Sequence, residues 1–153
     1  MAGYMVPLMN VAQRIIGKYM FQNLGVIWMD HTFVHFEIPV DDVEKMRRFY
    51  SKAFGWKIER MPGPMEYWNI ETVPVDEKGV PVRRGVNGGL IKKERSEQSP
   101  LSYIGVESLD ECTKKVESAG GKVLMRKEEV PGMGWWALIQ DPEGNSFGLF
   151  QPK

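Results

Sequence analysis

Hydrophobic and polar residues alternate along two segments of the chain that share one pattern. The alternating positions are Val34, Phe36, Ile38 and Val40 in the first segment and Ser102, Ile104 and Val106 in the second. Val106 lies 66 residues after Val40, and the two segments align at this offset. Alternation with a period of two is typical of a strand with one buried face, so each segment is predicted to be a half-buried strand.

An amphipathic helix is predicted directly after each of these strands. The apolar stripes are formed by Val43, Met46, Tyr50 and Phe54 in the first helix and by Leu109, Cys112, Val116 and Ala119 in the second. Two residue pairs at the helix starts have the spacing of a capping box: Asp41 with Glu44, and Ser108 with Glu111. Gly55 and Gly120 follow the stripes, where a left-handed residue commonly ends a helix. Cys112, on the second stripe, is expected to be a core residue.

Three short strands are predicted after each helix. Their ranges are 56–60, 67–73 and 87–92 in the first half and 122–126, 135–140 and 146–151 in the second. Residues 141–145 have the composition of a hairpin turn joining the last two strands. Residues 73–84 are expected to form an exposed inserted loop, and residues 92–100 a linker between the halves.

These elements predict an α+β fold built from two βαβββ repeats, whose strands form a curved mixed sheet around a central cleft. A single domain is expected over residues 30–153, with the first repeat at about 30–93 and the second at about 100–152. Residues 1–29 are expected to form an arm outside the repeats. We expect this arm to pack on its own domain or on the second copy of a homodimer.

The charge balance narrows the kinds of partner. Twenty Lys and Arg residues balance twenty Asp and Glu residues, so nothing attracts the chain to nucleic acid or to an anionic membrane. The N-terminal segment lacks the basic start and uninterrupted apolar run of a secretory signal, and its charge-free stretch is too short to cross a membrane. The single cysteine cannot form an internal disulfide, so the chain is expected to be cytoplasmic.

Strand alternation also selects candidate site residues. If Phe36 and Ile38 face the helix, then His35 and Glu37 face the cleft, where either could serve as a catalytic base. By the same rule the cleft is lined by Tyr103, Gly148 and Phe150. The alternative interpretation is that His35 and Glu37 are solvated groups on the open face of a half-buried sheet.

Four further aromatic residues are candidates for the walls of a ligand pocket: Tyr67, Trp68, Trp135 and Trp136. Adjacent strand residues point to opposite faces, so at most one of Trp135 and Trp136 lines the cleft. The alternative is that these rings belong to an ordinary core. Residues 131–134 precede the tryptophans and are predicted to form a rim loop.

Four stretches carry a resemblance to a known family: HFEIPVDD (35–42), FYSKAFGW (49–56), GPMEYW (63–68) and DPEGNSFGL (141–149). They resemble the vicinal-oxygen-chelate superfamily of glyoxalase, bleomycin-resistance and dioxygenase-like proteins. The likeness is strongest to its branch of enzymes related to lactoylglutathione lyase, and it covers residues 31–152. It implies the repeated βαβββ fold, with a small-molecule ligand between the repeats.

The resemblance also implies where a metal would bind, at positions that here are His35, Gly89, Leu101 and Gly148. Only His35 can bind a metal, and a catalytic divalent ion needs about three protein ligands. No cofactor is therefore predicted. A Zn, Ni, Fe or Mn ion held by His35, Glu37 and a recruited carboxylate is the alternative; His31 lies too far along the strand to join His35.

Two functions from different classes remain open at this point. The first is an enzyme acting on a small oxygenated metabolite by isomerase, lyase or dioxygenase-like chemistry, distinct from true glyoxalase I. The second is a metal-free protein that binds a small molecule or antibiotic, as bleomycin-resistance proteins do. A third, weaker interpretation is a scaffold subunit with a vestigial cleft.

Overall fold

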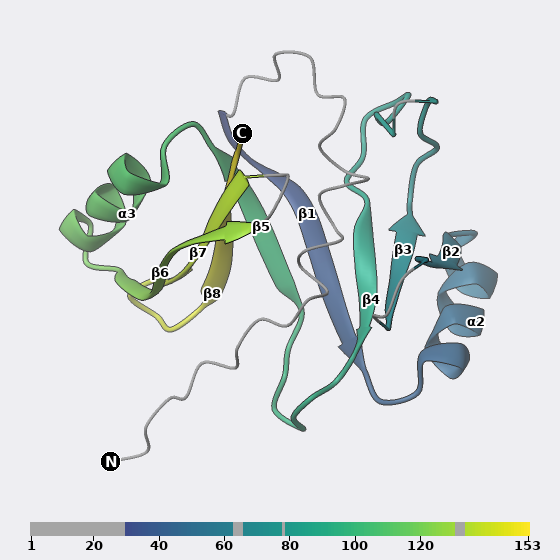
Figure 1. Cartoon of the computed structure of the whole chain (residues 1–153). Helices are drawn as coiled ribbons and strands as arrows, with labels where there is room; N and C mark the ends of the chain where they lie inside the picture. The colour runs from purple at the N-terminus through teal and green to yellow at the C-terminus, as the bar shows by residue number, and fades with distance from the viewer. Residues whose placement is uncertain (1–29, 63–65, 78, 131–133) are drawn as a thin grey trace.

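The computed structural model describes residues 30–62, 66–77, 79–130 and 134–153 (Figure 1). The predicted arm at 1–29 and most of the predicted rim loop lie outside these residues. The elements in chain order are β1 (Asp30–Val40), α2 (Val43–Phe54), β2 (Lys57–Arg60), β3 (Tyr67–Glu71), β4 (Gly88–Lys92), β5 (Leu101–Val106), α3 (Leu109–Ser118), β6 (Lys122–Val130), β7 (Gly134–Gln140) and β8 (Ser146–Pro152). No helix in this part of the chain is long and apolar enough to span a membrane.

The strands form a single mixed sheet with two equivalent halves. Their order is β2-β3-β4-β1-β5-β8-β7-β6, so in each half the first strand pairs with the fourth, the fourth with the third and the third with the second. The first and fourth strands run parallel in both halves, and all other neighbours run antiparallel. Strands β1 and β5 join the halves at the centre of the sheet. The predicted pair of βαβββ repeats is confirmed.

The two strands used to align the repeats end at matching positions. Val40 is the last residue of β1 and Val106 the last residue of β5, and both are buried. In each repeat the helix begins three residues later, at Val43 or Leu109. Figure 1 shows α2 and α3 at opposite ends of the sheet, each beside the strands of its own repeat.

The first helix begins one residue later than the capping-box spacing predicts. Asp42, not Asp41, is the N-cap, and its carboxylate accepts a hydrogen bond from the backbone N–H of Lys45 at 2.9 Å. Either of the two adjacent aspartates could have capped the helix, and Asp42 is the one with the extended backbone that an N-cap requires. The second helix follows the prediction, because Ser108 accepts from the N–H of Glu111.

The helix ends also differ. Gly55 has a φ of 70°, and its N–H bonds the carbonyl of Ser51, as predicted for a left-handed cap. In the second repeat Ala119 is the C-cap, with a φ of −86°. Gly120 adopts the left-handed conformation (φ 89°) one residue beyond that cap.

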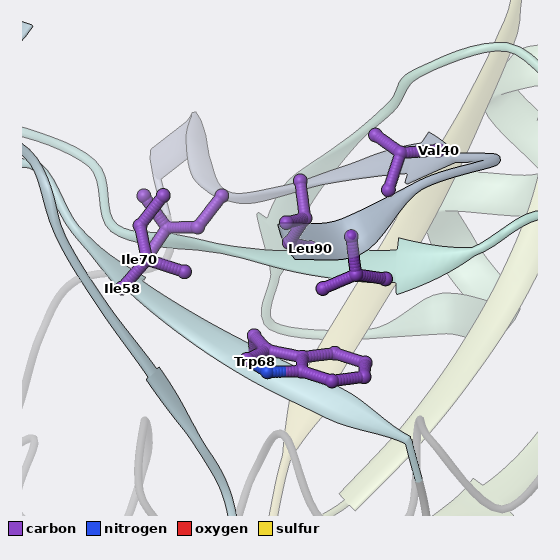
Figure 2. Packing of buried hydrophobic residues seen from close by; sticks show 6 residues of the cluster. Val40, Ile58, Trp68, Ile70 and Leu90 are labelled. Carbon is purple, nitrogen blue, oxygen red and sulfur yellow. The ribbon is translucent and has the colours of Figure 1, made fainter. Parts of the chain in front are cut away.

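Each helix covers its own hydrophobic core. The core beneath α2 includes Val40, Val43, Ile58, Trp68, Ile70 and Leu90, part of which is shown in Figure 2. The core beneath α3 includes Val106, Leu109, Ala137, Ile139 and Leu149, with Cys112 partly buried against it. The prediction that Phe54 ends the apolar stripe of α2 in the core is wrong. Its side chain is 59% exposed, and its ring contacts the rings of Tyr50 and Trp56.

A third apolar cluster lies on the opposite face of the sheet. It consists of Tyr103, Val130, Trp136 and Phe150, with Val34, Leu101, Met125 and Leu138 packed around it. Trp136 pairs with Phe150 across β7 and β8, which places both side chains on one face. The face turned away from the helices is therefore partly apolar, and the candidate site lies on this face.

Candidate functional site

His35 and Glu37 lie on β1, the strand at the centre of the sheet. Their neighbours Phe36 and Ile38 pack into the core beneath α2, so alternation turns His35 and Glu37 to the other face. Both side chains are deeply buried, at 3% exposure each. The interpretation of these residues as solvated groups on an open face is therefore wrong.

Each of the two residues has a tyrosine partner. The hydroxyl of Tyr103, on β5, donates a hydrogen bond to Oε2 of Glu37 at 2.9 Å. The hydroxyl of Tyr67, on β3, lies 3.2 Å from Nε2 of His35. The rings of His35 and Tyr103 are also neighbours, with centroids 5.6 Å apart. The structure thus gathers four residues from three strands into one buried polar group, which we call the Tyr–His–Glu–Tyr group.

Two glycines make room for the tyrosine rings. A Cβ atom added to Gly89, on β4, would overlap the hydroxyl and ring of Tyr67. A Cβ atom added to Gly148, on β8, would overlap the ring of Tyr103, which lies directly across the strand pair. Any larger residue at either position would displace the phenol ring that lies over it.

Burial sets the protonation of Glu37. Removal from water raises the pKa of Glu37 to about 7, and the hydrogen bond from Tyr103 opposes this shift without cancelling it. The second carboxyl oxygen, Oε1, is buried and has no hydrogen-bond partner among the described residues. Near neutral pH this carboxyl is therefore present in both its acid and base forms, and Oε1 is the oxygen that Tyr103 does not hold.

Burial acts in the opposite direction on the imidazole. It lowers the pKa of His35 to about 3, although the backbone of Asn87 opposes the shift, so the ring is neutral at neutral pH. Nδ1 of His35 has no partner of ordinary hydrogen-bond geometry within the described ranges. Burial, and then the charge of Glu37, raise the pKa of Tyr67 well above its usual value, so this phenol keeps its proton.

The other predicted wall residues divide between the two faces. Trp136 and Phe150 join Tyr103 in the apolar cluster on the face of the Tyr–His–Glu–Tyr group. Trp68 instead lies in the core beneath α2 with Leu90 (Figure 2). Trp135 packs on the side of α3, where the ammonium of Lys127 lies 5.0 Å from its ring centroid. Trp68 and Trp135 are therefore not brought together with the group.

Sequence reasoning missed one residue that supports the site, Asn87. Asn87 is buried, and its side chain bonds the backbone of Thr72 and Val73, which fixes the chain where it enters β4 beside His35. An asparagine just before Gly88 and Gly89 is the signal that could have indicated this role. The tyrosine pairing had no such signal, because Tyr67 lies 32 residues from His35.

The residues present do not match a divalent metal site. Across the described ranges, no group of three or more His, Cys, Asp or Glu side chains is placed to hold an ion. His35 and Glu37 are two such side chains, each already engaged by a tyrosine. A catalytic divalent ion takes about three protein ligands and an open position.

Comparisons with known proteins agree with this architecture. Residues 32–72 match the family described as bleomycin resistance protein-like N-terminal. A glyoxylase-like domain-containing protein of Didymella fabae is 30% identical over 121 residues, covering 74% of this chain and 88% of that protein. The probable lactoylglutathione lyase of Vibrio cholerae is 24% identical over 128 residues, covering 81% of this chain and 93% of that protein.

A third relative is longer than this chain. The anthracycline biosynthesis protein DnrV of Streptomyces peucetius is 27% identical over 130 residues, which cover 76% of this chain and only 45% of that protein. Among solved structures, a glyoxalase/bleomycin resistance protein/dioxygenase superfamily member from Vibrio splendidus 12B01 superposes with a TM-score of 0.54. Its sequence identity is 15%, over 79% of this chain and 98% of that chain, so the likeness concerns the fold. The repeated βαβββ sheet and these sequence matches together show that the chain belongs to the vicinal-oxygen-chelate superfamily of glyoxalase, bleomycin-resistance and dioxygenase proteins.

Proposed function

We propose that this protein is a metal-independent enzyme that moves a proton on a small oxygenated molecule, with Glu37 as the general base. One observation carries the proposal. The Glu37 carboxyl is buried, Tyr103 holds one of its oxygens, and the other oxygen has no partner in the described part of the chain. Such an unpaired buried oxygen is costly for stability, so a function that uses it accounts for its presence.

The protonation of Glu37 suits this role. A general base works best when its pKa is close to the working pH, because it then accepts and returns a proton with similar ease. Burial brings the pKa of Glu37 to about 7. The hydrogen bond from Tyr103 fixes the carboxyl orientation, so that the same oxygen can take a proton and give it back.

Tyr67, which lies beside His35 in the Tyr–His–Glu–Tyr group, supplies a hydrogen-bond donor. The phenol of Tyr67 stays protonated because burial raises its pKa well above the usual value. In the proposed reaction His35 carries its proton on Nε2 and donates it to the Tyr67 oxygen, which leaves the phenol proton for the substrate. Glu37 removes a proton from a carbon next to a carbonyl, and the phenol donates a hydrogen bond to the carbonyl oxygen on which negative charge develops. The carboxylic acid then returns the proton to carbon, giving an isomer or epimer with no net change in charge.

The charges around the Tyr–His–Glu–Tyr group favour a substrate whose reacting part is uncharged. The buried polar side chains of the described residues are His35, Glu37, Asn87 and Thr113, so no Lys or Arg is buried among them. A neutral imidazole and a partly ionised carboxyl offer no positive charge to a phosphate or carboxylate. The apolar cluster around Trp136 and Phe150 lies on the same face and suits a flat or apolar remainder of the ligand.

The relatives support a small oxygenated substrate. The names of the Vibrio cholerae and Streptomyces peucetius relatives refer to a lactoylglutathione lyase and to anthracycline biosynthesis. Since this chain spans less than half of the Streptomyces peucetius protein, the name of that protein supports only the proposed class of substrate. Dioxygenase-like chemistry is less well supported, since the donor set does not match a metal site.

The proposal is tested by hydrogen exchange at carbon. Candidate carbonyl compounds are incubated with the protein in D₂O, and loss of the α-proton is followed by ¹H NMR. A compound that exchanges with the native chain should exchange at least about 100-fold more slowly with Glu37→Gln, because general-base catalysis contributes roughly 10²–10⁴-fold. The matched control is Glu128→Gln, an exposed carboxyl on β6, which should exchange like the native protein.

A binding protein is the second candidate function. The match to bleomycin resistance protein-like sequences over residues 32–72 and the apolar cluster beside the polar group favour it. If a ligand binds with equal affinity to the native chain and to Glu37→Gln, and no compound exchanges its proton, the binding function replaces the enzymatic one.

A further inference from the structure

We propose that Tyr67 on Gly89 and Tyr103 on Gly148 are two positioning pairs, which orient His35 and Glu37 and fill the space that a metal ion would need. The inference rests on the proposed function for the role of Glu37. The packing of each pair is independent of any turnover, so it can be tested separately.

The two glycines occupy equivalent places in the fold. Gly89 lies on β4 and Gly148 on β8, the fourth strand of each repeat and the strand parallel to its first. Neither glycine has a left-handed backbone. Their common property is instead the ring above them, since a Cβ atom at either position would overlap a tyrosine.

The rings reach these glycines from strands that are not equivalent. Tyr67 comes from the third strand of the first repeat, and Tyr103 from the first strand of the second. Two different routes thus give a similar contact, in which a tyrosine fills the space beside a glycine and its hydroxyl reaches a buried titratable group. Gly89 meets the hydroxyl end of Tyr67, and Gly148 meets the ring of Tyr103. Because two non-equivalent strands supply the same kind of tyrosine–glycine contact, we infer that the contact itself has a role at the site.

The Tyr103 pair controls the acid–base behaviour of Glu37. The hydrogen bond from its hydroxyl favours the ionised carboxyl and so opposes the effect of burial on the pKa of Glu37. Loss of the hydroxyl, or displacement of the ring by a side chain at position 148, should remove the same interaction. Tyr103→Phe and Gly148→Ala are therefore expected to have the same effect on Glu37 although they alter different strands.

The same packing works against metal binding. A carboxylate introduced at Gly148 would extend toward the face of His35 and Glu37, and with them would give three ligands for a divalent ion. Its Cβ atom, however, would need the space that the Tyr103 ring fills. An added ligand alone should therefore be insufficient, and the ring must also be removed.

The first experiment measures the titration of Glu37 by ¹³C NMR of its labelled carboxyl carbon. The pKa of Glu37 should rise by at least about half a unit in both Tyr103→Phe and Gly148→Ala, and remain as in the native chain in the control Tyr50→Phe on α2. Circular dichroism melts establish that each variant is folded. An unchanged Glu37 titration in folded Tyr103→Phe would overturn the positioning role, whether or not a substrate is known.

The second experiment measures Ni²⁺ binding by calorimetry in four proteins: native, Gly148→Glu, Tyr103→Ala and the Gly148→Glu/Tyr103→Ala double variant. Only the double variant should bind one Ni²⁺ per chain, at least tenfold more tightly than either single variant, and His35→Ala should abolish that binding. Stoichiometric binding by Gly148→Glu alone would overturn the claim that Tyr103 excludes the metal. So would a folded double variant that binds no better than the single variants.

Discussion

The hydroxyl of Tyr103 lies 2.9 Å from Oε2 of Glu37, and the two residues are 66 residues apart in the chain. That separation equals the offset between Val40 and Val106, so the hydrogen bond joins equivalent positions of the two repeats. It crosses the centre of the sheet, where β1 and β5 run antiparallel. The repeated fold therefore places a phenol from one half beside a carboxyl from the other, and the site exists only when both halves have folded together.

The first prediction concerns stability between pH 4.5 and 6.5. The pKa of His35 falls from 6.5 to about 3 on folding, so this residue makes the protein more stable as the pH rises through that interval. The pKa of Glu37 rises from 4.5 to about 7, so it makes the protein less stable as the pH rises from 4.5 toward 7. The two effects oppose each other in the native chain, whose stability is expected to change little.

Glu37→Gln removes one of these opposing effects. The free energy of unfolding of that variant should then rise with pH by up to about 1.4 kcal/mol per pH unit, the value for one proton. Urea denaturation of both proteins at pH 4.5, 5.5 and 6.5 measures the difference. Parallel pH profiles for the two proteins would show that Glu37 is not protonated in the folded state over this range.

The second prediction tests the start of the first helix. Asp42→Ala should lower the free energy of unfolding by about 1 kcal/mol, because it removes the carboxylate that bonds the N–H of Lys45. Asp41→Ala removes only a surface ion pair with Lys93 at 3.4 Å, and should cost less than about 0.5 kcal/mol. Guanidinium denaturation measures the free energy of unfolding of both variants. A larger loss for Asp41→Ala than for Asp42→Ala would show that Asp41 is the N-cap.

The third prediction separates buried from exposed apolar residues on the side of α2. Leu90→Ala should cost about 2–5 kcal/mol, because this side chain is fully buried in the core and its removal leaves a cavity. Phe54→Ala should cost much less, since Phe54 is largely exposed despite its place on the predicted stripe. Chemical denaturation measures both values, and similar losses would mean that Phe54 is covered in solution.

The fourth prediction concerns the packing of Tyr67 on Gly89. Gly89→Ala should destabilise the protein, because the new Cβ atom overlaps the tyrosine hydroxyl and ring. The Gly89→Ala/Tyr67→Ala double variant should lose at least about 0.5 kcal/mol less than the sum of the two single losses, as expected for residues in contact. Additive losses in thermal or chemical denaturation would show that the ring does not press on this strand.

Much of the fold follows from local patterns in the sequence. Period-two alternation located β1 and β5, the helical stripes located α2 and α3, and the 66-residue offset indicated that the halves repeat. These signals are local, because strand and helix periodicity depend on residues only a few positions apart. The same alternation placed His35 and Glu37 on the face turned away from the helices, which depends only on the identity of their neighbours.

Only the tertiary structure decided what surrounds those two residues. The partners of His35 and Glu37 come from other strands, so register across the sheet fixes them, and no local pattern encodes that register. The sequence predicts that at most one of Trp135 and Trp136 lines the cleft, and the structure places Trp136 on that face and Trp135 on the side of α3. The same limit explains why alternation alone does not select Trp136 over Trp135, or exclude Trp68, which lies beneath α2. The sequence determined which face β1 gives to its polar residues. The packing of strands distant in the chain determined that this face is buried, which sets the pKa values on which the proposed chemistry depends.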